Sequence, residues 1–408
     1  MVFSRFSKAA SLRAGLMSRG PAGFRQVLEK SFCRDATSRK RQPVAALLSR
    51  SSNRCYCGLA FPARCLNSLR FVPQRRARRR VFQGGNRMLN FRTKFVAAGA
   101  LALSLGLGAV SVKAQEFINV LTGGTSGVYY PLGVALSEIY SKGIEGARTQ
   151  VQATKASVEN LNLLQQGKGE IAFALGDSVK LAAEGNTEAG FPGKLDKLRG
   201  IAAIYPNYIQ IVASKESGIK TLADLKGKSL SVGAPASGTE LNARTIFAAA
   251  GLKYEDLGRI EYLPFAESVE LIKNRQLDAT LQSAGLGVAS IRDLATSVPV
   301  NIVAVPAEDV AKIGSPYLSV VIPKGTYEGQ TDDVATAAVG NFLITSADVS
   351  DETAYQMTKL LFEHLDQLTA AHAAAKAIDP AKALDGMPVP LHPGAERYYK
   401  EKGAIPPP

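Results

Sequence analysis

The chain has 408 residues, 46% of them hydrophobic, and a formal net charge of +14 at pH 7. The positive charge is confined to the N-terminal part: residues 1–87 hold 20 Lys and Arg against two Asp and Glu, and residues 88–114 add three cations and no acid. The remaining chain therefore carries about −7. This balance argues against nucleic acid and anionic lipid as partners, because both select basic surfaces.

A short sorting segment begins at Met88. After two basic residues, an apolar run of small residues covers 95–110, and Val112-Lys113-Ala114 places small side chains at the two positions that a signal peptidase reads. The apolar run is shorter than the roughly 20 residues that span a bilayer. The sequence thus predicts a signal peptide at 88–114 and a soluble periplasmic protein that starts near Gln115.

Residues 1–87 are rich in Arg and Ser, as in a transit peptide or a nucleic-acid-binding arm. Neither interpretation explains the signal sequence that follows. We therefore interpret 1–87 as an unstructured extension produced by a start assigned too far upstream, with the protein beginning at Met88. All four cysteines lie in this extension, so the exported part has no disulfide and no thiol.

Short β-rich runs alternate with helical patterns over 115–408, which is typical of an α/β protein with largely parallel sheets. In the first half the patterns predict strands at 117–121, 150–153 and 171–175, and helices at about 129–139 and 157–166. In the second half they predict strands at 208–213, 230–232, 279–282 and 300–305, and helices at 240–250 and 350–368. Residues 335–344 fit either a strand or a helix.

Two turns rich in Gly, Ser and Thr follow predicted strands and precede predicted helices. The first covers 122–127 and the second contains Ser237-Gly238-Thr239. Ligands of open α/β sheets bind at the carboxyl ends of strands, and glycines allow backbone N–H groups to approach an anion there. The pair of turns therefore favours an anion site built largely from neutral donors. Ordinary capped turns have similar sequences, so that alternative stays open for each turn taken singly.

Other constellations do not indicate chemistry. The first turn lacks the GK[ST] ending of a nucleotide-binding loop, and no Gly-x-Ser-x-Gly elbow occurs. The three histidines His364, His372 and His392 lie near the C-terminus, and the first two are expected to face solvent on a helix. The sequence therefore predicts no metal, no cofactor and no catalytic residue.

Four stretches of the mature chain carry a family resemblance. They are 121–133 (LTGGTSGVYYPLG), 156–161 with 169–172, 217–239 from Ser-Gly-Ile to Ala-Ser-Gly-Thr, and 392–399 (HPGAERYY). In this order and behind a signal peptide, they resemble the TAXI proteins, the solute-binding subunits of tripartite ATP-independent periplasmic (TRAP) transporters. The resemblance covers nearly the whole mature chain.

The resemblance implies a type II periplasmic-binding-protein clamp, in which two α/β lobes joined by a hinge close on a small ligand. Lobe one would comprise 115–206 plus 319–408, and lobe two 207–318. The chain would cross between the lobes near 206–208 and again near 317–318.

Ligands of the resembled family are typically small carboxylates such as glutamate or 2-oxoglutarate. The resemblance places the ligand among polar side chains and turn glycines of both lobes, with Tyr130 either at the ligand or packed under the turn, and with Tyr205 and Gln282 added on position alone. The full set of expected ligand-binding residues is Gly124, Thr125, Ser126, Tyr129, Tyr130, Ser157, Asn160, Tyr205, Ser237, Gly238, Thr239 and Gln282.

This chain departs from the family pattern at three places. Ser126 and Ala236 stand where the family often has glycine, and both add a side chain near the expected cleft. Leu175-Gly176-Asp177-Ser178 replaces a Gln-Ser-Asp pattern, which puts the contacts of that loop in doubt.

The function implied is capture of a carboxylate or amino acid and its delivery to TRAP membrane subunits, which would be the protein's only contact with the membrane. A binding protein of an ABC importer and a ligand-sensing module are alternatives, because the clamp architecture is shared. An enzyme is disfavoured, since neither turn has near it in the sequence an acid/base pair or a serine, base and acid arranged as in a nucleophilic triad.

Overall fold

The computed structural model describes residues 116–405, and the predicted signal peptide and basic extension lie outside the described residues. In the described part the strands are β1 Phe117–Leu121, β2 Arg148–Gln152, β3 Ile171–Leu175, β4 Leu198–Ser214, β5 Ser229–Ser231, β6 Arg259–Glu261, β7 Ala279–Ala284, β8 Val300–Val303, β9 Leu318–Ile322 and β10 Val334–Ser346. The α-helices are α1 Tyr129–Gly143, α2 Ser157–Gln165, α3 Gly176–Glu184, α4 Gly238–Ala249, α5 Phe265–Lys273, α6 Ala289–Ser297, α7 Ala307–Ile313, α8 Asp351–Glu363, α9 Leu365–Ala371 and α10 Pro393–Glu401.

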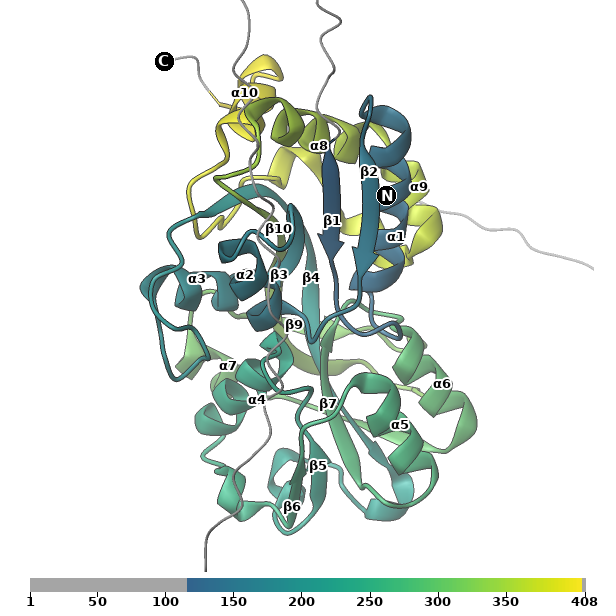
Figure 1. Cartoon of the computed structure of the whole chain (residues 1–408). Coiled ribbons are helices and arrows are strands. Elements are labelled where there is room, and N and C mark those ends of the chain that lie inside the picture. Colours follow the sequence, from purple (N-terminus) through teal and green to yellow (C-terminus); the bar gives the residue numbers. More distant parts are fainter. Residues whose placement is uncertain (1–115, 406–408) are drawn as a thin grey trace, which may run out of the picture. The chain divides into compact units, whose positions relative to one another are not determined.

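The strands form one continuous network in the order β2-β1-β3-β10-β4-β7-β5-β6, with β8 beside β4 and β9 beside β10. The pairs β1–β2, β1–β3, β5–β6 and β5–β7 are parallel, whereas β4 and β10 are antiparallel to their neighbours. Figure 1 shows β1–β3 with α1, α2 and α3 in the upper lobe, and β5–β7 with α4 to α7 in the lower lobe. The predicted α/β clamp architecture is confirmed.

The long strands β4 and β10 connect the two lobes. The first part of β4 pairs with β10, and from Tyr208 onward it pairs with β7 and then β8. Along β10, Ala338 still pairs with β9, and Asn341 pairs with β3. Strand β4 therefore changes partners near Tyr208, and β10 changes partners at 338–341. The predicted lobe boundaries stay a proposal, and β10 offers a position for the second crossing at 338–341 besides the one predicted near 317–318.

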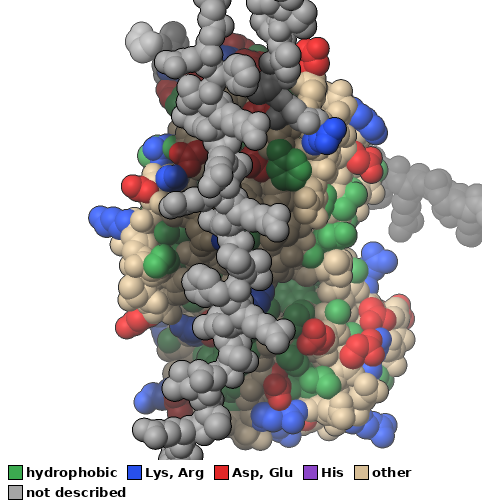
Figure 2. Space-filling view, in the orientation of Figure 1, with side chains coloured by type: hydrophobic (Ala, Val, Ile, Leu, Met, Phe, Trp, Pro, Cys, Tyr) green, Lys and Arg blue, Asp and Glu red, His purple; other side chains and the backbone are tan. Residues whose placement is uncertain are grey.

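Burial explains which runs form the inner strands. All of β3 and all of β7 are buried, as expected for strands covered on both faces. One hydrophobic cluster around Leu161 and Phe191 packs α2 and α3 onto the first lobe. A second, around Phe247 and Leu281, packs α4 onto the second lobe. Lys, Arg, Asp and Glu side chains are interspersed on the uncovered parts of the face in Figure 2, which fits the modest negative charge of residues 115–408.

The largest correction concerns the predicted helix at 350–368. It is two helices, α8 and α9, because His364 leaves the helical region with φ −126° and ψ 35°. The break turns α9 so that it packs against α1, with Leu368 buried. Residues 335–344, which fitted either structure, belong to strand β10.

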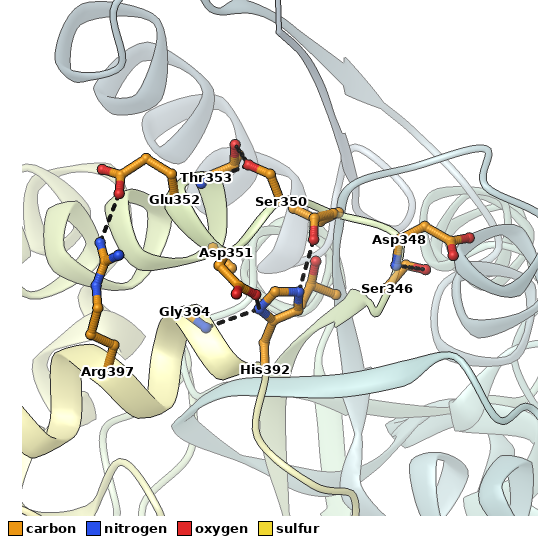
Figure 3. Close-up of polar contacts among 12 residues, drawn as sticks. Ser346, Asp348, Ser350, Asp351, Glu352, Thr353, His392, Gly394 and Arg397 are labelled. Atoms are coloured by element: carbon orange, nitrogen blue, oxygen red, sulfur yellow. Dashed lines mark hydrogen bonds and ion pairs between the residues drawn. The ribbon is translucent and has the colours of Figure 1, made fainter.

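The HPGAERYY stretch has a structural role at the start of α10 (Figure 3). The His392 ring is buried, and its Nδ1 accepts a hydrogen bond from the Gly394 N–H at 3.2 Å. Its Nε2 therefore carries the proton and donates to the Val349 carbonyl at 3.0 Å. Burial lowers the pKa of His392, although the Val349 carbonyl and the Asp351 carboxylate raise it in part.

This geometry makes stability depend on pH. A histidine with a lowered pKa binds fewer protons in the folded than in the unfolded chain, so the free energy of unfolding should fall as pH drops below about 6.5. We expect His392→Gln to flatten this pH dependence and to cost ~1 kcal/mol at pH 7.5 through the weakened cap. Denaturant unfolding at pH 7.5 and 5.5 measures both effects, with His364→Gln as the control. If the free energy of unfolding of His392→Gln fell between pH 7.5 and 5.5 as much as that of the unchanged protein, His392 would not be the source of the pH dependence.

Candidate functional site

The first Gly-rich turn lies between β1 and α1. The Gly127 N–H donates to the Gly124 carbonyl at 3.0 Å, which closes the turn. Its base is held by Thr122, whose hydroxyl donates to the Gln152 carbonyl at 2.8 Å. Helix α1 then starts at Tyr129 without a side-chain cap. The turn is thus fixed by its backbone and leaves the start of α1 uncapped.

The second turn lies between β5 and α4. Ser237 is the N-cap of α4, and its hydroxyl accepts from the Glu240 N–H at 3.1 Å. Ala236, immediately before it, has φ +58°, a left-handed conformation that glycine adopts at less cost. Alanine therefore stands where the resembled family often has glycine, and the backbone there has the left-handed conformation that glycine favours.

The second turn meets the start of α2 across the two lobes. The Glu159 N–H of α2 donates to the Ala236 carbonyl at 3.2 Å. A Cβ on Gly238 would lie 2.7 Å from Ser157 Oγ and 2.6 Å from Leu175 Cδ1. Only glycine permits this approach. In these contacts the second turn meets the start of α2 and not the first Gly-rich turn.

Two further contacts join the lobes. The buried Asp177 carboxylate of α3 accepts from Asn242 Nδ2 of α4 and from the Tyr317 hydroxyl, both at 2.6 Å. Burial raises the pKa of Asp177, and the hydrogen bond from Tyr317 is the main opposing influence. At the first turn, the Ser126 carbonyl accepts from the Ser290 N–H at the start of α6 at 3.4 Å. These contacts describe a closed arrangement.

A pocket lies between the facing turns. It holds about 710 Å³ of empty space, part of it open to solvent. Its polar and glycine lining consists of Gly123, Gly124, Gly127, Thr154, Lys155, Ser157, Asn207, Ser237, Gly238, Thr239 and Ser283. Its apolar lining consists of Val128, Tyr129, Ala156, Leu175, Ala234, Pro264, Phe265 and Ala284.

Half of the expected ligand-binding residues line this pocket. They are Gly124, Tyr129, Ser157, Ser237, Gly238 and Thr239. Thr125, Ser126 and Tyr130 lie beside it in the chain but are outside the lining. The Tyr129 hydroxyl donates to Asn341 Oδ1 in the core, so the ring rather than the hydroxyl is offered to the pocket. Burial raises the pKa of Tyr129, which keeps its hydroxyl protonated.

The other three expected residues are buried outside the lining. Asn160 holds the first turn in place, because its Nδ2 donates to the Thr122 carbonyl at 2.6 Å and to the Phe173 carbonyl at 2.9 Å. Gln282 accepts from the Ser290 hydroxyl at 2.6 Å. Tyr205 is 2% exposed, and its hydroxyl has no partner among the described residues. The structure thus places these side chains around the pocket and not in its wall.

Lining residues that were not expected at the ligand include Lys155, Asn207, Ser283 and Phe265. Asn207 and Ser283 reach the pocket because β4 and β7 pair where β4 changes partners. Phe265 starts α5 and comes close to Gly127 of the first turn. No local pattern marks these positions. Lys155 could have been predicted from the sequence, because it is the cation that lies just before the predicted helix at 157–166.

The pocket favours negative charge. The helices α1, α2, α4 and α5 begin at residues that line it, and each helix start carries a partial positive charge. The N–H groups of Ser157, Gly238 and Thr239 find no acceptor in the described part of the chain. Lys155 adds a cation, and no Asp or Glu appears in the lining. Over residues 116–405 no cluster of metal-ligating side chains occurs.

Fold and pocket together define a two-lobed α/β clamp with a pocket between its lobes. A family model described as the NMT1-like family matches residues 120–403. The chain belongs to the NMT1-like family. The TAXI assignment stays a prediction.

Solved structures with a similar chain path have low identity. A protein from Bordetella bronchiseptica RB50 is 19% identical, with 71% of this chain and 90% of that chain covered and a TM-score of 0.43. The periplasmic binding protein BugD is 13% identical, with 72% and 95% covered and a TM-score of 0.46. The periplasmic aliphatic sulphonate binding protein SsuA from Escherichia coli is 16% identical, with 72% and 94% covered and a TM-score of 0.39. At this level of similarity the three structures carry no argument about the ligand.

Gly238→Ala tests the contact between the lobes. Gly238 has ordinary helical geometry, so the added methyl strains only the approach to Ser157 and Leu175. We expect the substitution to destabilise the closed arrangement by ~1–3 kcal/mol, and the radius of gyration in solution X-ray scattering to increase. Gly193→Ala is the control, because nothing lies within 4 Å of its added methyl. Equal scattering from both variants and the unchanged protein would refute the contact.

Proposed function

We propose that this protein captures a small carboxylate in the periplasm and delivers it to a membrane transporter. The observation that supports this most is the pocket between the starts of α2 and α4, where the N–H groups of Ser157, Gly238 and Thr239 have no acceptor within residues 116–405. Buried or partly buried N–H groups require acceptors. A carboxylate supplies them and also gains from the helix starts and from Lys155.

Capture would proceed by closure of the lobes. Ser157 belongs to α2 of the first lobe, and Gly238 and Thr239 belong to α4 of the second. A carboxylate that accepts from both helix starts binds the closed arrangement more tightly than the open one and shifts the equilibrium toward closure. The Asp177–Asn242 hydrogen bond and the Glu159–Ala236 hydrogen bond form only when the lobes meet, so they add to the same state.

The membrane partner we propose is the pair of TRAP transporter membrane subunits, on the basis of the TAXI-like stretches. Binding to an ABC importer is the second candidate, because a clamp of this type can serve either. In residues 116–405, none of the helices has the length and apolarity needed to cross a bilayer. Uptake assays with both candidate transporters distinguish the two: an ion gradient drives the first and ATP drives the second.

Calorimetry tests the carboxylate site. A panel of small carboxylates and amino acids should contain at least one ligand that binds and raises the melting temperature. Lys155→Gln should weaken binding about fivefold, with a smaller difference at high salt. Lys168→Gln, also an exposed lysine of the first lobe, is the control and should bind normally. No binding by any member of the panel would count against the proposed function.

A further inference from the structure

The wall of the pocket is apolar over much of its extent. Phe265, Val128 and Ala284 contribute apolar side chains, and Leu175 contributes another beside Gly238. The hydroxyl groups, by contrast, gather where α2 and α4 begin. Apolar wall is favourable only for a ligand with apolar surface of its own, because a polar group placed there loses its water without a new partner.

Several polar side chains of the lining are already occupied. Asn207 donates through Nδ2 to the Ser283 carbonyl at 2.8 Å and accepts through Oδ1 from Asn341 at 2.6 Å. The Thr154 hydroxyl accepts from the Ala156 N–H at 2.9 Å and donates to Asn160 Oδ1 at 2.7 Å. The groups that remain for a ligand are mainly donors at the helix starts and at Lys155. These donors can bind one anionic head group of a ligand.

A ligand ammonium group has no carboxylate to pair with in this pocket. The lining contains no Asp or Glu. Most acids that neighbour the lining in the sequence are engaged: Asp177 accepts from Asn242 and Tyr317, and Glu159 accepts from the Lys155 backbone N–H at 2.6 Å. Glu240 pairs with Arg244 at 2.7 Å, and Glu267 is exposed to solvent. A buried ammonium without such a partner is costly.

We infer that the pocket takes a monocarboxylate with an apolar body and no ammonium group, such as a branched 2-oxo acid. This inference rests on the proposed function and narrows its ligand class. It departs from the glutamate-like and 2-oxoglutarate-like ligands that the family resemblance implies. A second carboxylate would meet the apolar wall near Phe265, and an amino group would remain unpaired.

Three matched ligands test the inference with the full-length protein. 4-Methyl-2-oxopentanoate and leucine share one carbon skeleton and differ in the 2-oxo or 2-ammonium group. 2-Oxoglutarate keeps the 2-oxo acid head and replaces the branched end with a carboxylate. By calorimetry we expect 4-methyl-2-oxopentanoate to bind about 10- to 100-fold more tightly than either of the others.

A variant locates the apolar body. Phe265→Ala should lower the ratio of the affinity for 4-methyl-2-oxopentanoate to that for pyruvate, which has the same head group without the branched end, about tenfold. Tyr262→Ala is the control, since Tyr262 is an exposed aromatic residue 42% accessible to solvent and outside the pocket lining. The ratio should not change in this control.

The outcomes separate the inference from the proposed function. If leucine or 2-oxoglutarate binds as tightly as 4-methyl-2-oxopentanoate or more tightly, the inferred ligand class is wrong and the carboxylate site stands. An affinity ratio unaffected by Phe265→Ala also overturns the inference. If none of the four compounds binds but another carboxylate of the calorimetry panel does, the inference fails and the proposed function stands. If no member of the panel binds, both fail.

Discussion

The close approach of Gly238 to Ser157 is the constraint on which the pocket depends. It brings the starts of two helices from different lobes together and leaves no room for a Cβ. The residues that precede the two helix starts have left-handed backbone conformations: Ala156 has φ +75° and Ala236 has φ +58°. Such conformations cost of order 1–3 kcal/mol each for residues other than glycine and cluster at ligand sites. Here Ala156 lines the pocket, and Ala236 directly precedes the lining residue Ser237 and accepts from the Glu159 N–H of α2.

The close contact of Gly238 with Ser157 determines the charge and the shape of the site. Two helix starts that face one space offer N–H groups to one small acceptor, and the donors come from different lobes, so binding and closure become one event. The rest of the wall is supplied by α1, α5 and the central strands, and it is largely apolar. A pocket with donors in one region and apolar wall elsewhere recognises a head group and a body separately.

The sequence predicted the strand–turn–helix units well, because each is a local pattern. β1 and β3 have the predicted bounds, and helix 240–250 ends before Gly251 as expected. The first half of β4 was missed because Gly200 and Pro206 are unusual in strands, and only pairing with β10 holds them in one. Of the pocket lining, the sequence predicted mainly residues of the two Gly-rich turns and of the helix starts. Asn207, Ser283 and Phe265 reach it through strand pairing and helix packing between distant segments, which no local pattern encodes.

A crystal structure of the protein with a bound carboxylate tests the central claim most directly. The account predicts that the carboxylate oxygens lie within hydrogen-bonding distance of the backbone N–H groups of Ser157 in one lobe and of Gly238 or Thr239 in the other. A carboxylate bound by one lobe alone, or in the separate surface hollow lined by Lys215, Asn301 and Asp332, would contradict it.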